Sequence, residues 1–476
     1  MYDISDPLSH ILNLCIEQGY FPEEIKKGCI TPIYKKGVHH DIENYRPVCS
    51  LSQFSKIFEK MIYIHMTNYI SKNNIITSSQ YGFQAGKSTE SALIDLVDFV
   101  HNGLTEKSNV GAVFMDLSKA FDVMSHDILK TKLEHYGFRG SFLTFLMDFL
   151  KDRKYFVNVN GHSSITKISN IGVPQGSTLG PLLFLIYIND VINCSNILKF
   201  ILFADDTTIM YKTKNINDLN YILTRELKKV INWFSANKLM LNLSKTHTML
   251  FSNKRNKGNL ELNIQNIQLE EKEVVSFLGV EIDKKLLWQS HIKYICSKVS
   301  KSIGILRRLR YSFPKNILKM IYMSLIHSYI NYCNVVWGSA YSTHLKPLVT
   351  LQKKAIRIIN KSKFDTKTSP IFHSLGILNV ENVHKLNCLT FMFNCLKGNK
   401  FPIFRNKVME NAFNHNYNTR NREQLNPPFE RLEICRKSFF CKGIDLWNNL
   451  NLSLGCNNNV HSFKKIIKSK LIDGDF

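Results

Sequence analysis

Two adjacent aspartates, Asp205 and Asp206, are the residues of this 476-residue chain whose types and spacing are best suited to chemistry. They lie inside an apolar segment that runs from Lys199 to Tyr211. Apolar runs on either side of a short acidic centre predict a β-hairpin with the carboxylates at its tip. Two neighbouring carboxylates repel each other and are costly to desolvate, so a divalent metal is the usual way to neutralise them. The alternative is a solvated turn, because turns favour Asp.

A third carboxylate, Asp116, directly follows the apolar run Val110-Gly-Ala-Val-Phe-Met115, which is typical of a buried strand. Its alternative role is to cap the helix expected next. Between Asp116 and the hairpin lies Gly172-Val-Pro-Gln-Gly-Ser-Thr-Leu-Gly-Pro181. So many glycines and prolines fix a backbone that lets a ligand approach closely, and they indicate a binding surface around Gln175. Three carboxylates near such a loop suit two-metal phosphoryl transfer.

Other segments must position these residues. We expect a helix over residues 8–16, a strand over 29–34, a mobile basic loop that includes residues 44–47, and a helix that begins with a capping box of Ser50 and Gln53. Residues 82–88 resemble a phosphate-binding P-loop but are one residue too short. We therefore interpret Ser88 as a helix cap, with Lys87 exposed beside it. Further along, we expect a long helix over residues 219–234 and a strand pair bent at Gly279.

The charge balance predicts a polyanionic partner. Lys and Arg number 62 against 38 Asp and Glu, which gives a net charge of +24 and a pI of about 9.5. Nucleic acid is the first candidate, an anionic membrane the second, and a basic protein without such a partner the alternative. A hydrophobic share of 44% argues against disorder, and the length favours two or more domains.

Location is predicted from what the sequence lacks. The first residues do not form a signal peptide, and the longest apolar run, residues 182–188, is too short to span a bilayer. The 11 cysteines show no paired spacing, which is typical of a reducing compartment. We therefore expect an intracellular protein of the nucleus and cytoplasm that binds no membrane.

Helices with many basic residues are expected from residue 291 onward. Lys301, Arg308 and Lys315 are spaced by seven residues, so they share one face if the helix is continuous. Together with Arg307, they are our candidates for contact with a nucleic-acid backbone. A second basic stripe, which includes Lys346, is better interpreted as a solvated helix face.

The ordered motifs resemble those of reverse transcriptases of non-LTR retrotransposons, most of all the Jockey group. The resemblance rests on Phe114-Met-Asp-Leu-Ser-Lys-Ala-Phe-Asp122, the loop at residues 172–181, Phe203-Ala-Asp-Asp206 and Phe277-Leu-Gly279. Asn44-Tyr-Arg-Pro47 and Gln80-Tyr-Gly-Phe83 are similar to that family's fingers motifs. The similarity extends over about residues 8–290 in unbroken order, which makes it highly specific.

The resemblance implies an α+β fold of the right-hand polymerase type. The fingers would span residues 1–110, the palm with its antiparallel sheet 111–285, and a helical thumb-like region 286–365. A mostly helical C-terminal region of unknown role would span residues 366–476. Related elements usually carry an endonuclease upstream, and we see no room for one before the fingers, so we expect the polymerase portion of a mobile element.

The resemblance also implies roles for individual residues. Asp116, Asp205 and Asp206 would be catalytic and would bind two Mg²⁺ ions, with Mn²⁺ as the alternative metal. Lys245 would protonate the leaving pyrophosphate, which agrees with the stabilisation that a lysine gives to developing negative charge. The remaining candidates would contact the incoming nucleotide: the Leu117 carbonyl, Phe121 at the 2′ position of the sugar, Gln175 along the nucleotide, and Arg46.

The implied function is RNA-directed DNA polymerisation: transfer from a dNTP to the 3′-hydroxyl of a DNA primer on an RNA template. A related RNA-making polymerase is the close alternative, and Phe121 argues against it because a bulky ring excludes a ribose 2′-hydroxyl. The second alternative is an inactive retroelement remnant that only binds RNA. Gln84, where the family commonly has Arg, favours this alternative, and the three retained carboxylates oppose it.

Overall fold

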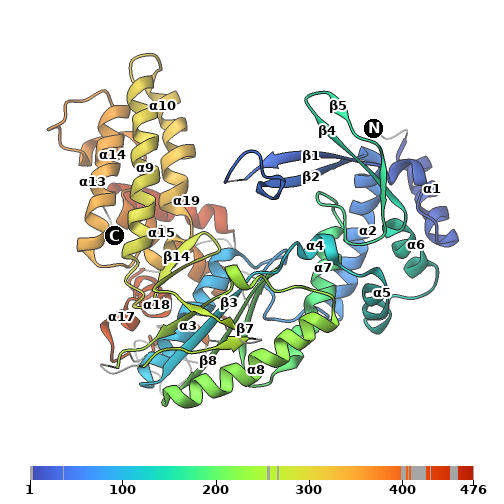
Figure 1. Cartoon of the computed structure of the whole chain (residues 1–476). Coiled ribbons are helices and arrows are strands. Elements are labelled where there is room, and N and C mark those ends of the chain that lie inside the picture. The colour runs from blue at the N-terminus through green and yellow to red at the C-terminus, as the bar shows by residue number, and fades with distance from the viewer. Residues whose placement is uncertain are drawn as a thin grey trace.

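The computed structural model describes residues 4–35, 37–254, 258–264, 267–397, 404–405, 407–408, 425–428, 430–450 and 459–474. It is a mixed α+β structure in which an N-terminal part with a small sheet and a C-terminal helical part stand on either side of a central five-stranded sheet (Figure 1). Within these ranges, no helix is both long and apolar enough to cross a bilayer.

The N-terminal part joins four α-helices to a sheet in the order β2-β1-β4-β5, with β6 also paired to β4. Its elements are α1 (Ser5–Gln18), η2 (Glu23–Ile25), β1 (Gly28–Tyr34), η3 (Ile42–Asn44), β2 (Tyr45–Leu51), α2 (Gln53–Lys72), α5 (His126–His135), α6 (Gly140–Leu150), β4 (Arg153–Val159), β5 (His162–Ser163) and β6 (Lys167–Ser169). The first helix ends where Gly19 adopts a left-handed φ of 67°, as its position in the sequence indicates.

Two local predictions in this part are wrong. Residues 45–47 belong to β2 rather than to a loop, since β1 and β2 pair along seven residues from Gly28↔Leu51 to Tyr34↔Tyr45. Ser50 therefore lies in a strand, and α2 starts after Ser52 without a side-chain cap. Backbone pairing with a distant segment outweighed the local capping signal.

The central sheet has the order β12-β9-β3-β8-β7, with β3 (Asn109–Met115) in the middle and antiparallel to β8 (Asp206–Thr213) and β9 (His247–Phe251). β7 (Lys199–Phe203) and β12 (Glu270–Glu271) form its edges, and β10 (Asn263–Ile264) pairs with β11 (Ile267–Gln268) separately. Every residue of β3 is buried because both faces of the sheet are covered. α3 (Thr89–Thr105) packs on the face of Val110 and Ala112, and α8 (Ile216–Ala236) on the face of Val113 (Figure 1).

Short elements complete the region around this sheet: α4 (Ala120–Val123), α7 (Gly180–Ile188), η4 (Asn189–Cys194) and η5 (Leu243–Lys245). The strand pair bent at Gly279 is present as β13 (Val274–Phe277) and β14 (Val280–Asp283). The predicted cap of α3 is also confirmed, because the Ser88 hydroxyl accepts a hydrogen bond from the Ser91 amide. Lys87 is not the exposed residue we expected: its ammonium is largely buried and donates to the carbonyls of Ser78 and Gln80.

The C-terminal part begins with α9 (Gln289–Leu309), α10 (Lys315–Tyr322), η6 (Met323–His327), α11 (Ser328–Asn331), α12 (Asn334–Trp337) and α13 (Ser342–Ile359). The helix that we expected to carry Lys301, Arg308 and Lys315 is not continuous. It ends at Leu309, and Pro314 is the N-cap residue of the next helix, since a proline disfavours the helical conformation of the residue before it. Lys315 therefore begins a separate helix and does not extend the face of Lys301 and Arg308.

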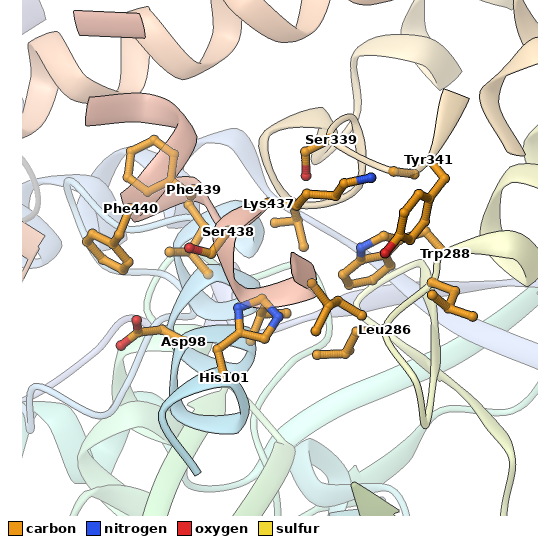
Figure 2. A pocket seen from close by; sticks show the side chains of 16 residues that line it. Asp98, His101, Leu286, Trp288, Ser339, Tyr341, Lys437, Ser438, Phe439 and Phe440 are labelled. Atoms are coloured by element: carbon orange, nitrogen blue, oxygen red, sulfur yellow. The ribbon is translucent and has the colours of Figure 1, made fainter. Parts of the chain in front are cut away.

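The remaining helices are α14 (Ser369–Leu375), α15 (Val380–Leu396), α17 (Glu433–Arg436), α18 (Phe439–Asn448) and α19 (Val460–Asp473). They share one hydrophobic core with α9, α13 and α3. A cavity of about 30 Å³ lies where α3, the segment before α9 and the start of α18 meet, and His101 and Tyr341 line it (Figure 2). The C-terminal region thus packs against the back of the central sheet.

Candidate active site

The hairpin that carries Asp205 and Asp206 is confirmed. β7 and β8 pair antiparallel, and Phe203 lies opposite Asp206, so residues 204 and 205 form the turn. Ala204 adopts a left-handed φ of 54°, the strained position of this tight turn. Both carboxylates are half-buried.

Asp116 lies beside this turn. β3 pairs with β8 up to Met115↔Thr207, so Asp116, the residue that follows β3, reaches the level of Asp206. The electrostatics agree with this placement: burial and the charges of Asp205 and Asp116 raise the pKa of Asp206 to about 6. Burial also raises the pKa of Asp205, and the charge of Asp116 adds to this shift. The structure therefore places Asp116 within electrostatic range of Asp205 and Asp206, which lie 89 and 90 residues further along the chain.

Lys245 joins the same group. Its ammonium lies 3.2 Å from a carboxylate oxygen of Asp116. The segment before it is tied to the strand end, because the Asn242 amide donates to the Asp116 carbonyl over 2.8 Å. Leu117 lies directly opposite Leu241 in an isolated bridge and is only 4% exposed, so its side chain serves the core.

The loop at residues 172–181 is attached to the segment that follows Asp116. The side-chain amide of Gln175 donates to the carboxylate of Asp122 over 2.8 Å, and the backbone amide of Val173 donates to the carbonyl of Phe121 over 2.9 Å. Gly172 has a φ of +73°, and a Cβ there would lie 2.5 Å from the Asp122 carbonyl, so only glycine fits. Sequence reasoning assigned no role to Asp122, although it ends one of the quoted motifs.

Glu59 on α2 is a second residue that sequence reasoning missed. Its fully buried carboxylate accepts hydrogen bonds from the amides of Thr178 and Leu179, at 2.6 and 3.2 Å, and from the Ser55 hydroxyl at 3.0 Å. Burial raises its pKa, and these hydrogen bonds oppose the shift. The available signal was an acid between Phe58 and Ile62, on the buried face of an amphipathic helix.

Phe121 lies next to this loop. Its ring is tilted by 31° against that of Phe184 on α7, with the ring centres 4.5 Å apart. Phe184 is fully buried, whereas Phe121 is only partly buried. The Phe121 ring is therefore fixed on one side by Phe184, and its partly exposed side is accessible to a bound molecule.

Positive charge faces the carboxylates from the N-terminal sheet. The charges of Arg46 and Lys35 both lower the pKa of Asp205, against the larger upward effect of burial. Arg46 is exposed at the end of the β1–β2 hairpin. This placement suits contact with an anionic ligand above the three aspartates.

The four basic candidates of the C-terminal part lie on α9 and α10, which stand opposite β1 and β2, with the central sheet below both (Figure 1). Lys301, Arg307 and Arg308 are exposed on α9. Lys315 is exposed at the start of α10, where its ammonium donates to the Asn360 side chain over 2.9 Å. These residues are therefore available to a ligand that extends away from the aspartates.

The donor set around the turn fits a hard divalent cation, because all three groups are carboxylates and burial leaves two of them poorly neutralised. Nevertheless, the described ranges contain no three Asp, Glu, His or Cys side chains already converged as a metal site. Asp116 is paired with Lys245 instead. A metal bound by Asp116 would therefore compete with Lys245 for this carboxylate.

Comparison with known proteins identifies the class. The family model described as "Reverse transcriptase (RNA-dependent DNA polymerase)" matches residues 33–282, which is more than half of the chain. The match includes all three aspartates, the Gln175 loop and β2. The chain belongs to the reverse transcriptase family, and its α+β fold is that of a right-hand polymerase.

Relatives narrow the group. The chain is 27% identical over 387 residues to "Probable RNA-directed DNA polymerase from transposon BS" of Drosophila melanogaster, a match that covers 79% of this chain and 42% of that protein. It is 27% identical over 383 residues to "RNA-directed DNA polymerase from mobile element jockey" of the same species, covering 78% and 41%. The chain therefore spans about two fifths of these relatives, and the Jockey-like, non-LTR group inferred from its motifs is confirmed.

Among solved structures, the chain is similar to "Structure of apo telomerase from Candida Tropicalis", with 13% sequence identity and a TM-score of 0.41. The match covers 81% of this chain and 68% of that one.

Proposed function

We propose that this chain is an RNA-directed DNA polymerase of a mobile element, which extends a DNA primer on an RNA template with dNTPs. The observation that carries the proposal is the strand register: it places Asp116, directly after β3, level with the β7–β8 turn of Asp205 and Asp206. Family membership and the names of the relatives support this reading.

The three aspartates would bind Mg²⁺, which lowers the pKa of the primer hydroxyl and stabilises the leaving pyrophosphate. Mg²⁺ suits the site because it needs only a few carboxylates beside substrate phosphates. Lys245, already 3.2 Å from Asp116, would be released as Asp116 turns towards the metal. Its ammonium would then donate a proton to the pyrophosphate oxygen.

Other residues would bind and orient the nucleotide. Arg46 and Lys35 would face its phosphates, because they lie within electrostatic range of Asp205. Gln175, held by Asp122 at 2.8 Å, would form one wall, and the Phe121 ring would fill the space of a ribose 2′-hydroxyl. The exposed Lys301, Arg307, Arg308 and Lys315 would contact the phosphates of the duplex.

Primer extension tests the proposal. Purified protein, an RNA template with an annealed DNA primer, dNTPs and Mg²⁺ should give template-directed products, whereas Asp205→Ala should bind the same duplex without extending it. Omission of Mg²⁺, its replacement by Mn²⁺, and replacement of dNTPs by rNTPs test the metal and the sugar. Wild-type protein that binds the duplex and extends it no more than Asp205→Ala would refute the proposal and favour an RNA-binding remnant.

A further inference from the structure

The turn that carries Asp205 and Asp206 is held by a segment from a distant part of the chain. Residues 79–81 run beside β7, where the Tyr81 amide donates to the Leu202 carbonyl over 2.7 Å and the Leu202 amide donates to the Ser79 carbonyl over 2.9 Å. These bonds form an isolated parallel bridge between Gln80 and Leu202. β7 is an edge strand, so this short segment covers it next to the catalytic turn.

The Gln80 side chain reaches the turn itself. Its carbonyl oxygen accepts hydrogen bonds from the amide of Ala204, at 3.0 Å, and from the amide of Gly82, at 2.8 Å. Because both neighbours are N–H donors, the oxygen and not the nitrogen must face them. Ala204 has a left-handed φ of 54° and directly precedes Asp205, so the bond fixes the strained residue that aims the carboxylates.

Burial indicates that this contact serves the turn more than general stability. Gln80 is only 1% exposed, and its side-chain nitrogen has no hydrogen-bond partner among the described residues. A buried donor without a partner costs about 1–3 kcal/mol, so an apolar side chain would relieve that cost. An apolar side chain could not replace the amide oxygen, which accepts hydrogen bonds from both Ala204 and Gly82.

Gly82 supports the same arrangement. A Cβ at this position would lie 2.5 Å from the Ala204 nitrogen and 3.0 Å from the Phe203 carbonyl carbon. The segment can approach the turn this closely only because residue 82 has no side chain. Gly82 does not have a positive φ, so an alanine there would act on the turn by contact alone.

The segment is fixed at both ends. Lys87 donates to the carbonyls of Ser78, at 2.6 Å, and Gln80, at 2.7 Å. The Tyr81 hydroxyl donates to Asp95 over 2.9 Å, and Asp95 pairs with Lys199, the first residue of β7, over 2.6 Å. The turn therefore rests on a support that α3 and its N-terminal cap hold in place.

We propose that Gln80 is a positioning residue of the polymerase reaction, which holds the Ala204–Asp205 turn so that the aspartates meet Asp116 in the geometry that metal and nucleotide require. This inference rests on the proposed function. The Gln80 side chain bonds to the backbone amides of Ala204 and Gly82, so it would act on the carboxylates through the backbone of Ala204.

Two variants test it, each with a matched control. The first test variant, Gln80→Met, keeps the length of the side chain and removes the hydrogen-bond acceptor. Its control, Gln352→Met, removes an equally buried side-chain amide from α13, far from the site. The second test variant, Gly82→Ala, places a methyl group against the backbone of the Ala204 turn. Its control, Gly304→Ala, adds a methyl group where no atom lies within 4 Å. We expect both test variants to bind primer–template normally and to extend it about 100-fold more slowly, the scale of a misplaced reacting group, with a higher half-maximal Mg²⁺ concentration.

A second readout is independent of activity. Hydrogen exchange of the Ala204 amide should become about fivefold faster in Gln80→Met, since a hydrogen bond worth about 1 kcal/mol is lost. Gln352→Met should lose thermal stability without changing this exchange or the Mg²⁺ requirement. A folded Gln80→Met with wild-type exchange at Ala204, or with wild-type extension, would overturn the proposal.

If Gln80→Met does not fold, the extension rate and the half-maximal Mg²⁺ concentration of Gly82→Ala test the proposal instead. Wild-type values of both in Gly82→Ala would then overturn it. If the wild type extends no primer, the proposed function is refuted, and the exchange comparison alone then decides whether Gln80 holds the turn.

Discussion

Replacing Phe121 by alanine should relax the choice of sugar. The ring is held against the buried Phe184 at 4.5 Å, so it cannot swing aside when a ribose enters. Steric rejection of one extra hydroxyl group in a fitted pocket is worth about 1–3 kcal/mol, or about 10–200-fold in kcat/KM. We therefore expect Phe121→Ala to lose about 100-fold of the discrimination between dNTP and rNTP. Because Phe121 is only partly buried, the loss of stability should be about 2 kcal/mol, below the range for a fully buried ring.

Single-nucleotide incorporation with dCTP or CTP on one RNA template measures this ratio directly. Phe142→Ala is the matched control: Phe142 is also partly buried, and its ring is tilted by 33° against that of Phe138, but it lies on α6. This control should lose stability and keep its sugar preference. Unchanged discrimination in Phe121→Ala, or an equal change in Phe142→Ala, would refute the assignment of Phe121.

Two further predictions concern charged residues. Lys245→Met should slow nucleotide incorporation about 100-fold, as expected for a lost general acid. It should change the free energy of unfolding by less than about 1 kcal/mol, because the ion pair with Asp116 is exposed. The control Lys154→Met removes the exposed ion pair with Glu23 and should leave the rate unchanged, so equal rates in the two variants would exclude Lys245 as the general acid. Lys301→Gln and Arg308→Gln should each reduce the slope of log affinity for primer–template against log salt concentration by about one. The control Lys346→Gln, on α13, should leave this slope unchanged. If only Lys346→Gln changes the slope, the duplex binds on α13 and not on α9.

Local patterns predicted the parts of the site that depend on neighbouring residues. The apolar runs on either side of Asp205 and Asp206 predicted the hairpin, and the apolar run before Asp116 predicted the strand. The Ser88 cap followed from residue type and position. In each case, the residues that decide the structure are close together in the sequence, so their pattern carries the information.

The contacts that hold the site together could not be predicted in the same way. Gln80 bonds to Ala204 across 124 residues, and Glu59 bonds to Thr178 across 119. Nothing near Gln80 in the sequence indicates which distant amide its oxygen will meet. The same limit explains the error at residues 45–47, since only their pairing with β1 makes them a strand.

Helices α9 and α10 show a related limit. Lys301, Arg308 and Lys315 are exposed, but the common face predicted for them depended on one continuous helix, and the chain instead starts a new helix after Pro314. The proline was visible in the sequence, so this error was avoidable. The C-terminal helices, in contrast, offered no local signal of their packing against α3, which the hydrophobic core reveals.

The most direct test of the account is the incorporation rate of Asp116→Asn on an RNA template with a DNA primer, measured at saturating protein so that duplex binding is matched to the wild type. Asp116 follows β3, whereas Asp205 and Asp206 lie at the turn between β7 and β8, so its effect reports whether the three act as one centre. The account predicts template-directed extension by the wild type and a loss of at least about 100-fold in the variant. Extension by Asp116→Asn at the wild-type rate would contradict it.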